Sequence, residues 1–261
     1  MHTPSIIFYR MLFSVAMLAV LILIRRESFR ISAKQLKAIF FLSIFYAATS
    51  LLLVESYLYI PSGLATTISF LYPIAVTLIL FFGFGQRVSA STLIAILLSF
   101  AGVFLLSFKS VSGNLDGRGL LCVIITIFTY SAYIVGMNKS CVNSLGSLVL
   151  SFYVLLFTTL FFSINMSLQG GLESIPGFME LGSLLLLGFI PTVLSNIFLF
   201  LALKRIDSAT TSLFGCMEPL TALLVGYFVF SEEMLWQQVL GAAIIIAAVL
   251  MVVLQTFKGK S

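Results

Sequence analysis

The chain is a succession of long apolar runs separated by short polar breaks or breaks containing glycine and proline. A helix of roughly 20 apolar residues spans the hydrocarbon core of a bilayer, so each run is predicted to be a transmembrane helix. Hydrophobic residues fill 61% of the 261 positions and charged residues only 9%, against about 25% in soluble domains. We therefore predict an all-α polytopic membrane protein with nine spans, at residues 6–24, 38–58, 63–84, 91–108, 118–137, 146–166, 181–203, 208–230 and 236–256.

The lysines and arginines between these runs gather on one side of the membrane. That side holds eleven of them: Arg25, Arg26, Arg30, Lys34, Lys37, Arg87, Lys139, Lys204, Arg205, Lys258 and Lys260. The other side holds only Lys109 and Arg118, and Arg10 lies inside a span. Loops rich in positive charge stay in the cytoplasm. We therefore predict a plasma-membrane protein with its N-terminus outside the cell and its C-terminus in the cytoplasm. The net charge of +5 then reflects topology and contact with anionic lipids, with no nucleic-acid partner.

The residue types exclude several kinds of chemistry. One histidine, His2, and three scattered cysteines cannot supply a metal cluster or a histidine-based triad. The chain contains no phosphate-binding loop of the form GxxxxGK[ST], so nucleotide hydrolysis within it cannot drive transport. We expect no enzyme activity, no cofactor and no metal.

A weak internal repeat relates the two halves. At a shift of 146 positions, eight residues of the first half match the second, among them Pro73 with Pro219. The unit is five helices, and because five is odd the second copy crosses the membrane in the opposite sense. The repeats are predicted at 1–108, with helices two to five, and at 118–256. The fifth span, 118–137, opens the second repeat, and its counterpart in the first repeat would precede residue 1. The chain is therefore either a nine-helix variant or begins at an internal methionine; we favour the second.

Two prolines at matched repeat positions point to a binding site. Pro73 and Pro219 lie near the middle of their spans, and each should release the backbone carbonyl four residues earlier, at Ser69 and Gly215. Matched interruptions in two inverted repeats mark the midplane site of many transporters, although prolines in membrane helices also merely kink them.

Glu218 stands beside the second proline, ten residues past the start of its span, or about 15 Å deep. A charge at that depth is costly, so we expect the residue to face a polar cavity. It would bind a substrate amine or exchange a proton with it. The alternative is a structural hydrogen bond between helices.

Three further residues are candidate contacts for the substrate. Tyr72 occupies the repeat position of Glu218, and Asn196 is polar in the middle of a span. Arg10 either faces a central cavity or extends its long side chain to the outer interface. A separate set of small residues, Ala95, Gly102, Gly241 and Ala248, is expected only to let helices approach closely.

Over nearly its whole length the chain resembles the EamA-like domain of the drug/metabolite transporter superfamily, and the second half carries most of the matching residues. The resemblance rests on Asp207-Ser208-Ala209, Cys216-Met217-Glu218-Pro219-Leu220-Thr221-Ala222, Phe230-Ser231-Glu232-Glu233, Gln238 and Gly241-Ala242-Ala243. Arg10 is also similar to an arginine early in the second helix of that family. The first half departs from the pattern, with Gln86 and Arg87 where the second half has Glu232 and Glu233, and with Tyr72 in place of Glu218.

This resemblance implies ten helices in two inverted repeats and transport of small organic solutes, often outward. We predict a secondary-active exporter of metabolites or drugs that works by alternating access and is driven by an ion or substrate gradient, with proton coupling open. The alternative is a flippase for lipid-linked substrates or a structural subunit of another transporter. The sequence leaves the oligomeric state open, a homodimer included.

Overall fold

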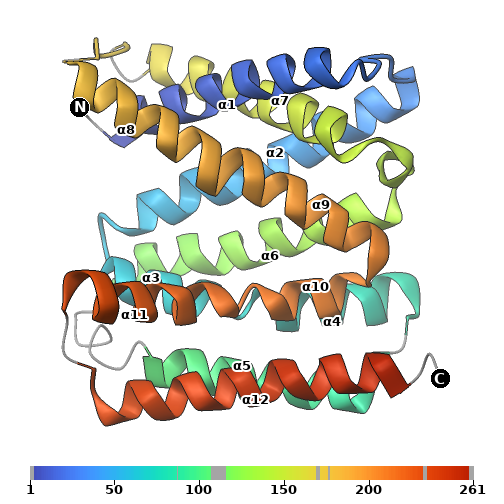
Figure 1. Ribbon diagram of the computed structural model, residues 1–261, viewed down its shortest axis with the longest axis vertical. Helices are drawn as coiled ribbons and strands as arrows, with labels where there is room; N and C mark the ends of the chain where they lie inside the picture. The colour runs from blue at the N-terminus through green and yellow to red at the C-terminus, as the bar shows by residue number, and fades with distance from the viewer. Residues whose placement is uncertain are drawn as a thin grey trace. The chain divides into compact units, whose positions relative to one another are not determined.

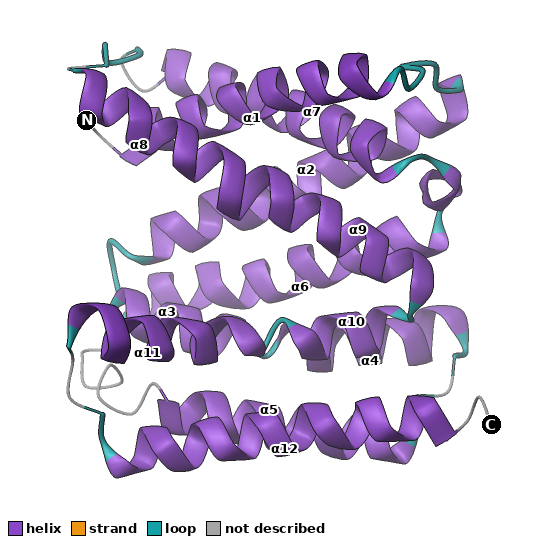
Figure 2. Ribbon diagram, viewed as in Figure 1, coloured by secondary structure: helices purple, strands orange, loops and turns teal. Residues whose placement is uncertain are grey.

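The computed structural model describes residues 3–86, 88–106, 116–168, 171–175, 177–231 and 234–258, and these form helices joined by short connections (Figures 1 and 2). The elements are α1 (Thr3–Arg25), α2 (Ala33–Ser56), α3 (Ser62–Ser69), α4 (Tyr72–Phe84), α5 (Ala90–Leu106), α6 (Gly117–Lys139), η2 (Cys141–Ser144), α7 (Ser147–Leu168), α8 (Phe178–Gly188), η3 (Phe189–Leu194), α9 (Ser195–Arg205), α10 (Ser208–Phe214), α11 (Met217–Phe230) and α12 (Trp236–Lys258). Arg87, Lys109, Glu232, Glu233 and Lys260, which the sequence argument used, lie outside the described residues.

The predicted membrane-spanning architecture is confirmed. Within the described residues, eight helical segments are long and apolar enough to cross a bilayer, and α5 is a ninth, shorter apolar helix of 17 residues. One of the eight, Phe178–Arg205, is longer than predicted because α8, η3 and α9 run on without a break.

The two proline-containing spans are interrupted at matched places, as predicted. The third span divides into α3 and α4 and the eighth into α10 and α11, with short breaks at residues 70–71 and 215–216. Each proline sits in the first turn of the helix that follows its break, where its missing N–H costs least. The expected release of the Gly215 carbonyl is wrong, because that oxygen accepts a hydrogen bond from the Glu218 backbone N–H at 3.0 Å.

A third irregularity was not predicted. The element η3 is a π-helical segment that contains Pro191. Its widened turn is visible in the hydrogen bond from the Thr192 hydroxyl to the Leu187 carbonyl, five residues earlier, at 3.1 Å. Proline cannot donate to the preceding turn, which gives a local cause for the widened turn.

The chain divides into two compact units, Met1–Ala47 with Gly136–Arg205, and Ala48–Val135 with Ile206–Ser261. In the first unit α1 packs against α7, α8 and η3. The Ser14 hydroxyl ties α1 to the end of α8 through the Gly188 carbonyl, at 2.9 Å. The Tyr153 hydroxyl of α7 donates to the carbonyl of Phe29 at 2.8 Å. These two hydrogen bonds join α1 to the end of α8, and α7 to the segment between α1 and α2.

In the second unit α5 and α12 lie side by side along their length (Figure 1). Gly102 and Gly241 face each other so closely that a Cβ on Gly102 would lie 2.8 Å from the Gly241 carbonyl oxygen. Ala95 and Ala248 are fully buried in the same interface. The predicted packing role of these small residues is confirmed.

Gly102→Ala should therefore destabilise the protein. The added Cβ would also lie 2.6 Å from Cγ1 of Ile245, and overpacking of this kind costs about 1–3 kcal/mol. We expect a lower midpoint of thermal unfolding in detergent. Gly83→Ala in α4 is the matched control, because its Cβ would meet only Ile79, at 4.0 Å. Equal midpoints for the two variants would contradict this close approach.

Candidate functional site

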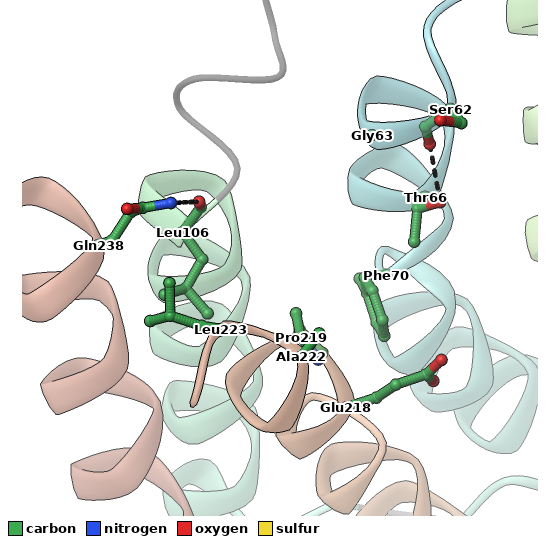
Figure 3. Close-up of a pocket in the computed structure, with 10 residues that line it drawn as sticks. All are labelled: Ser62, Gly63, Thr66, Phe70, Leu106, Glu218, Pro219, Ala222, Leu223 and Gln238. Atoms are coloured by element: carbon green, nitrogen blue, oxygen red, sulfur yellow. Dashed lines mark hydrogen bonds between the residues drawn. The ribbon is translucent and has the colours of Figure 1, made fainter. Parts of the chain in front are cut away.

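An open cleft of about 390 Å³ lies within the second unit (Figure 3). It is bordered by α3, α5, α11 and α12, and its lining residues are Ser62, Gly63, Thr66, Phe70, Leu106, Glu218, Pro219, Ala222, Leu223 and Gln238. The two interrupted spans contribute most of this surface, α3 from one half of the chain and the start of α11 from the other. The helix break before α11 is what brings Glu218 and Pro219 to the cleft.

Glu218 is the one ionisable residue among the ten described lining residues. It lies in the first turn of α11, where a carboxylate is stabilised by the positive end of the helix dipole. The side chain is exposed and points across the cleft toward Phe70 (Figure 3). Among the described residues, its carboxylate makes no hydrogen bond or ion pair. Glu218 therefore faces an open cleft, without a protein partner for its carboxylate among the described residues.

The other polar groups of the cleft are largely engaged. The Thr66 hydroxyl donates to the Ser62 carbonyl at 2.8 Å. The Gln238 amide donates to the Leu106 carbonyl at 3.2 Å, and its oxygen accepts from the Leu235 N–H at 2.9 Å. Gln238 thus links α12 to α5 at the rim of the cleft. The remaining surface is apolar.

Tyr72, which the predicted repeat aligns with Glu218, is buried and does not line the cleft. Its hydroxyl donates to the Ser212 carbonyl, in the last turn of α10, at 2.9 Å. Its ring lies edge-on to Tyr130 with centroids 4.9 Å apart, and its own carbonyl accepts from the Ser131 hydroxyl at 3.0 Å. Gly215 leaves the room for this arrangement, because a Cβ there would overlap the Tyr72 hydroxyl.

The two helix breaks are therefore in different states. Ser208 to Leu213 of α10 are all buried, whereas in α3, which the predicted repeat pairs with α10, only Leu64, Ala65 and Thr67 are buried. At α10 the tyrosine of the partner span is bonded to the last helical turn. At α3 the equivalent residue, Glu218, faces open space. Of the two half-helices that the predicted repeat pairs, α10 is packed and α3 borders the open cleft.

Arg10 and Asn196 belong to the other compact unit and are described with it. Arg10 is half-buried on α1, and its Nε is buried with no hydrogen-bond partner among the described residues. Asn196 is buried and its amide donates to the Thr192 carbonyl at 2.8 Å, one turn earlier in the same helix. Of the predicted site residues, only Glu218 and Pro219 line the cleft, and Pro73 is buried in α4.

Sequence reasoning missed several lining residues. Phe70 stands at the break before α4, and Ser62 begins α3. The sequence signal available for Phe70 was its position three residues before Pro73, where a proline-induced helix break is expected. No sequence signal distinguished Leu106 or Leu223 from other apolar helix residues.

Comparison with known proteins decides the family. A model of the EamA-like transporter family matches residues 1–108 and 117–254. This chain belongs to the EamA-like transporter family. As an EamA-like protein it is a multi-pass membrane transporter, and the match over both halves confirms the resemblance noted from the sequence.

Relatives of this EamA-like chain agree with that assignment. An uncharacterized transporter of Archaeoglobus fulgidus is 24% identical over 227 residues, covering 86% of this chain and 80% of the relative. A second uncharacterized transporter of the same organism is 26% identical over 172 residues, covering 64% of this chain and 58% of the relative. The crystal structure of another protein superposes on this chain with a TM-score of 0.84 at 15% sequence identity. The superposition covers all of this chain and 90% of the other, which shows that the two share a fold.

Proposed function

We propose that this protein is a secondary-active exporter of small organic solutes that works by alternating access. The observation that carries the proposal is the unequal state of the two helix breaks, with α3 open at the Glu218 cleft and α10 packed shut by Tyr72. Inverted-repeat transporters expose their site to one side at a time by exchanging the conformations of the two repeats. A closed and an open copy of one element within one structure is the arrangement that such an exchange requires.

The open cleft faces the exterior in this proposal. Ser62, Leu106 and Gln238 lie at helix ends next to the loops that carry few positive charges, the side expected outside the cell. The buried α10 begins at Asp207, next to Lys204 and Arg205, on the side expected in the cytoplasm. The proposal therefore describes an outward-open unit in the plasma membrane, with the C-terminus in the cytoplasm.

Glu218 is proposed to couple solute movement to protons. Its carboxylate has no partner among the described residues, so either a proton or a cationic group of the solute can neutralise it. A site that binds either a proton or the cationic solute, but not both at once, exchanges protons for solute across the membrane. Proton-driven export follows from that competition without any nucleotide.

Metabolite profiling tests the transport function. Cells that produce the protein should accumulate one or a few small organic compounds in the medium relative to cells that carry an empty vector. Collapse of the proton gradient with an uncoupler should remove the difference. A profile that matches the empty vector would contradict export. Export that persists with the uncoupler would contradict proton coupling but leave export standing.

A further inference from the structure

The hydrogen-bonding groups of the cleft favour one class of ligand. We propose that the cleft recognises small organic monocations with an apolar body, such as primary amines, with the ammonium group bound at Glu218. The inference rests on the proposed function, because it names the substrate class of the same cleft.

The first step is the balance of donors and acceptors. The Thr66 hydroxyl donates its proton to the Ser62 carbonyl and lies 3.4 Å from the Tyr57 hydroxyl, so it is largely engaged within the protein. The Gln238 amide uses its oxygen and one of its two N–H groups within the protein, so its second N–H can still donate. The Ser62 hydroxyl and the backbone N–H groups of Ser62 and Gly63, in the first turn of α3, are further donors. Among the described lining residues Glu218 is the one charged acceptor, and its carboxylate suits an ammonium group with its several N–H donors and no lone pair.

The second step is charge. Glu218 is the sole ionisable group among the described lining residues, so no lysine or arginine of that set would attract an anion. A carboxylate ligand would meet repulsion from Glu218, with no cationic side chain among the described lining residues to offset it. An ammonium ligand would form a charge-assisted hydrogen bond, the strongest kind available in this cleft.

The third step is the apolar surface. Leu106, Pro219, Ala222 and Leu223 line the cleft beyond Glu218, and Phe70 lies on its α3 side. Figure 3 shows the Phe70 ring on the side of the cleft toward which the Glu218 side chain points. An aromatic ring beside a carboxylate provides a second favourable surface for a cation, through its negative face. A ligand whose cation meets Glu218 and Phe70 would lay its hydrocarbon part on the apolar wall.

Equilibrium binding to the purified protein in lipid nanodiscs tests the proposal with three probes of similar size and different charge. These are 2-phenylethylamine as the cation, 2-phenylethanol as the neutral compound and 3-phenylpropionate as the anion. We expect saturable binding of the amine, at least tenfold tighter than of either other probe. Equal affinity for the anion or the alcohol, or no binding of the amine, would overturn the proposal.

Variants assign the binding to the cleft. Glu218→Gln should weaken amine binding at least tenfold, Glu218→Asp should retain most of it, and Phe70→Leu should weaken it severalfold while leaving the alcohol unchanged. Glu55→Gln is the matched control, since Glu55 is an exposed carboxylate of the same unit that accepts from the Tyr59 hydroxyl at 3.4 Å and does not line the cleft. Unchanged binding in a folded Glu218→Gln protein would overturn the assignment.

The same probes separate this inference from the proposed function. Binding of the amine at Glu218 without its transport in vesicles would leave the inference standing and contradict the exporter. Transport of anionic or neutral solutes through a cleft that does not bind the amine would leave the exporter standing and overturn the inference.

Discussion

Glu218→Gln should abolish proton-driven transport while leaving the protein folded and inserted. The amide has nearly the same shape as the carboxyl group but can neither bind a proton at neutral pH nor pair with a cation. Because the carboxylate makes no hydrogen bond or ion pair among the described residues, its replacement removes no such contact from the fold. We expect transport driven by an imposed pH gradient to fall at least tenfold in proteoliposomes that contain equal amounts of each protein.

The control for this prediction is again Glu55→Gln, which should transport as the wild type does. The midpoint of thermal unfolding of Glu218→Gln should lie close to that of the wild type, since α11 keeps its backbone hydrogen bond from residue 218 to Gly215. Undiminished transport with unchanged dependence on the pH gradient would remove Glu218 from the mechanism.

Gly215→Ala should disrupt the packing of Tyr72 against α10 in the second unit. The new methyl group would occupy the space of the Tyr72 hydroxyl, which would lose its hydrogen bond to the Ser212 carbonyl. Overpacking and a lost buried hydrogen bond each cost on the order of 1–3 kcal/mol, so a large drop in the unfolding midpoint and in transport is expected. Gly182→Ala in α8 is a suitable control, because a Cβ there has no atom within 4 Å.

A second substitution shows whether Tyr72 is the cause. Tyr72→Phe removes the colliding oxygen and leaves the ring carbon that bore it 3.0 Å from the new methyl group. The double variant should therefore recover part of the stability that Gly215→Ala loses, and the two effects should be non-additive. Strictly additive losses would mean that Tyr72 and Gly215 do not depend on each other.

Much of the architecture could be predicted from the sequence because the bilayer restricts what an apolar run can form. Run length placed the spans, and Pro73 and Pro219 marked the two breaks, since a proline cannot donate the hydrogen bond that a continuing helix needs. Pro191 carries the same chemical signal, yet it lies in a π-helical segment within a continuous span. Whether a proline breaks, kinks or widens a helix depends on the neighbouring helices, which the local sequence does not contain.

The candidate site was only partly predictable for a related reason. Glu218 stood out because a charge at mid-span depth is costly, and the structure gives it an open cleft. Tyr72 was singled out by its predicted repeat position, but its hydroxyl is bonded to α10, because Gly215 leaves room for it beside the Ser212 carbonyl. Phe70 and Ser62 were missed because periodicity does not show which face of a half-helix meets a cleft.

The exchange of states between α3 and α10 can be measured most directly by alkylation from the two sides of the membrane. Thr66→Cys and Ser212→Cys occupy matched repeat positions, and each would be introduced after Cys122, Cys141 and Cys216 are replaced by alanine. A membrane-impermeant maleimide added to intact cells should label the cysteine at position 66 and not that at position 212, and addition of the transported solute should slow the first reaction. The same reagent applied to inside-out vesicles should label position 212 faster when the solute is present. Alternating access at these two breaks would be contradicted by labelling of both positions from the same side, or by rates that the solute leaves unchanged.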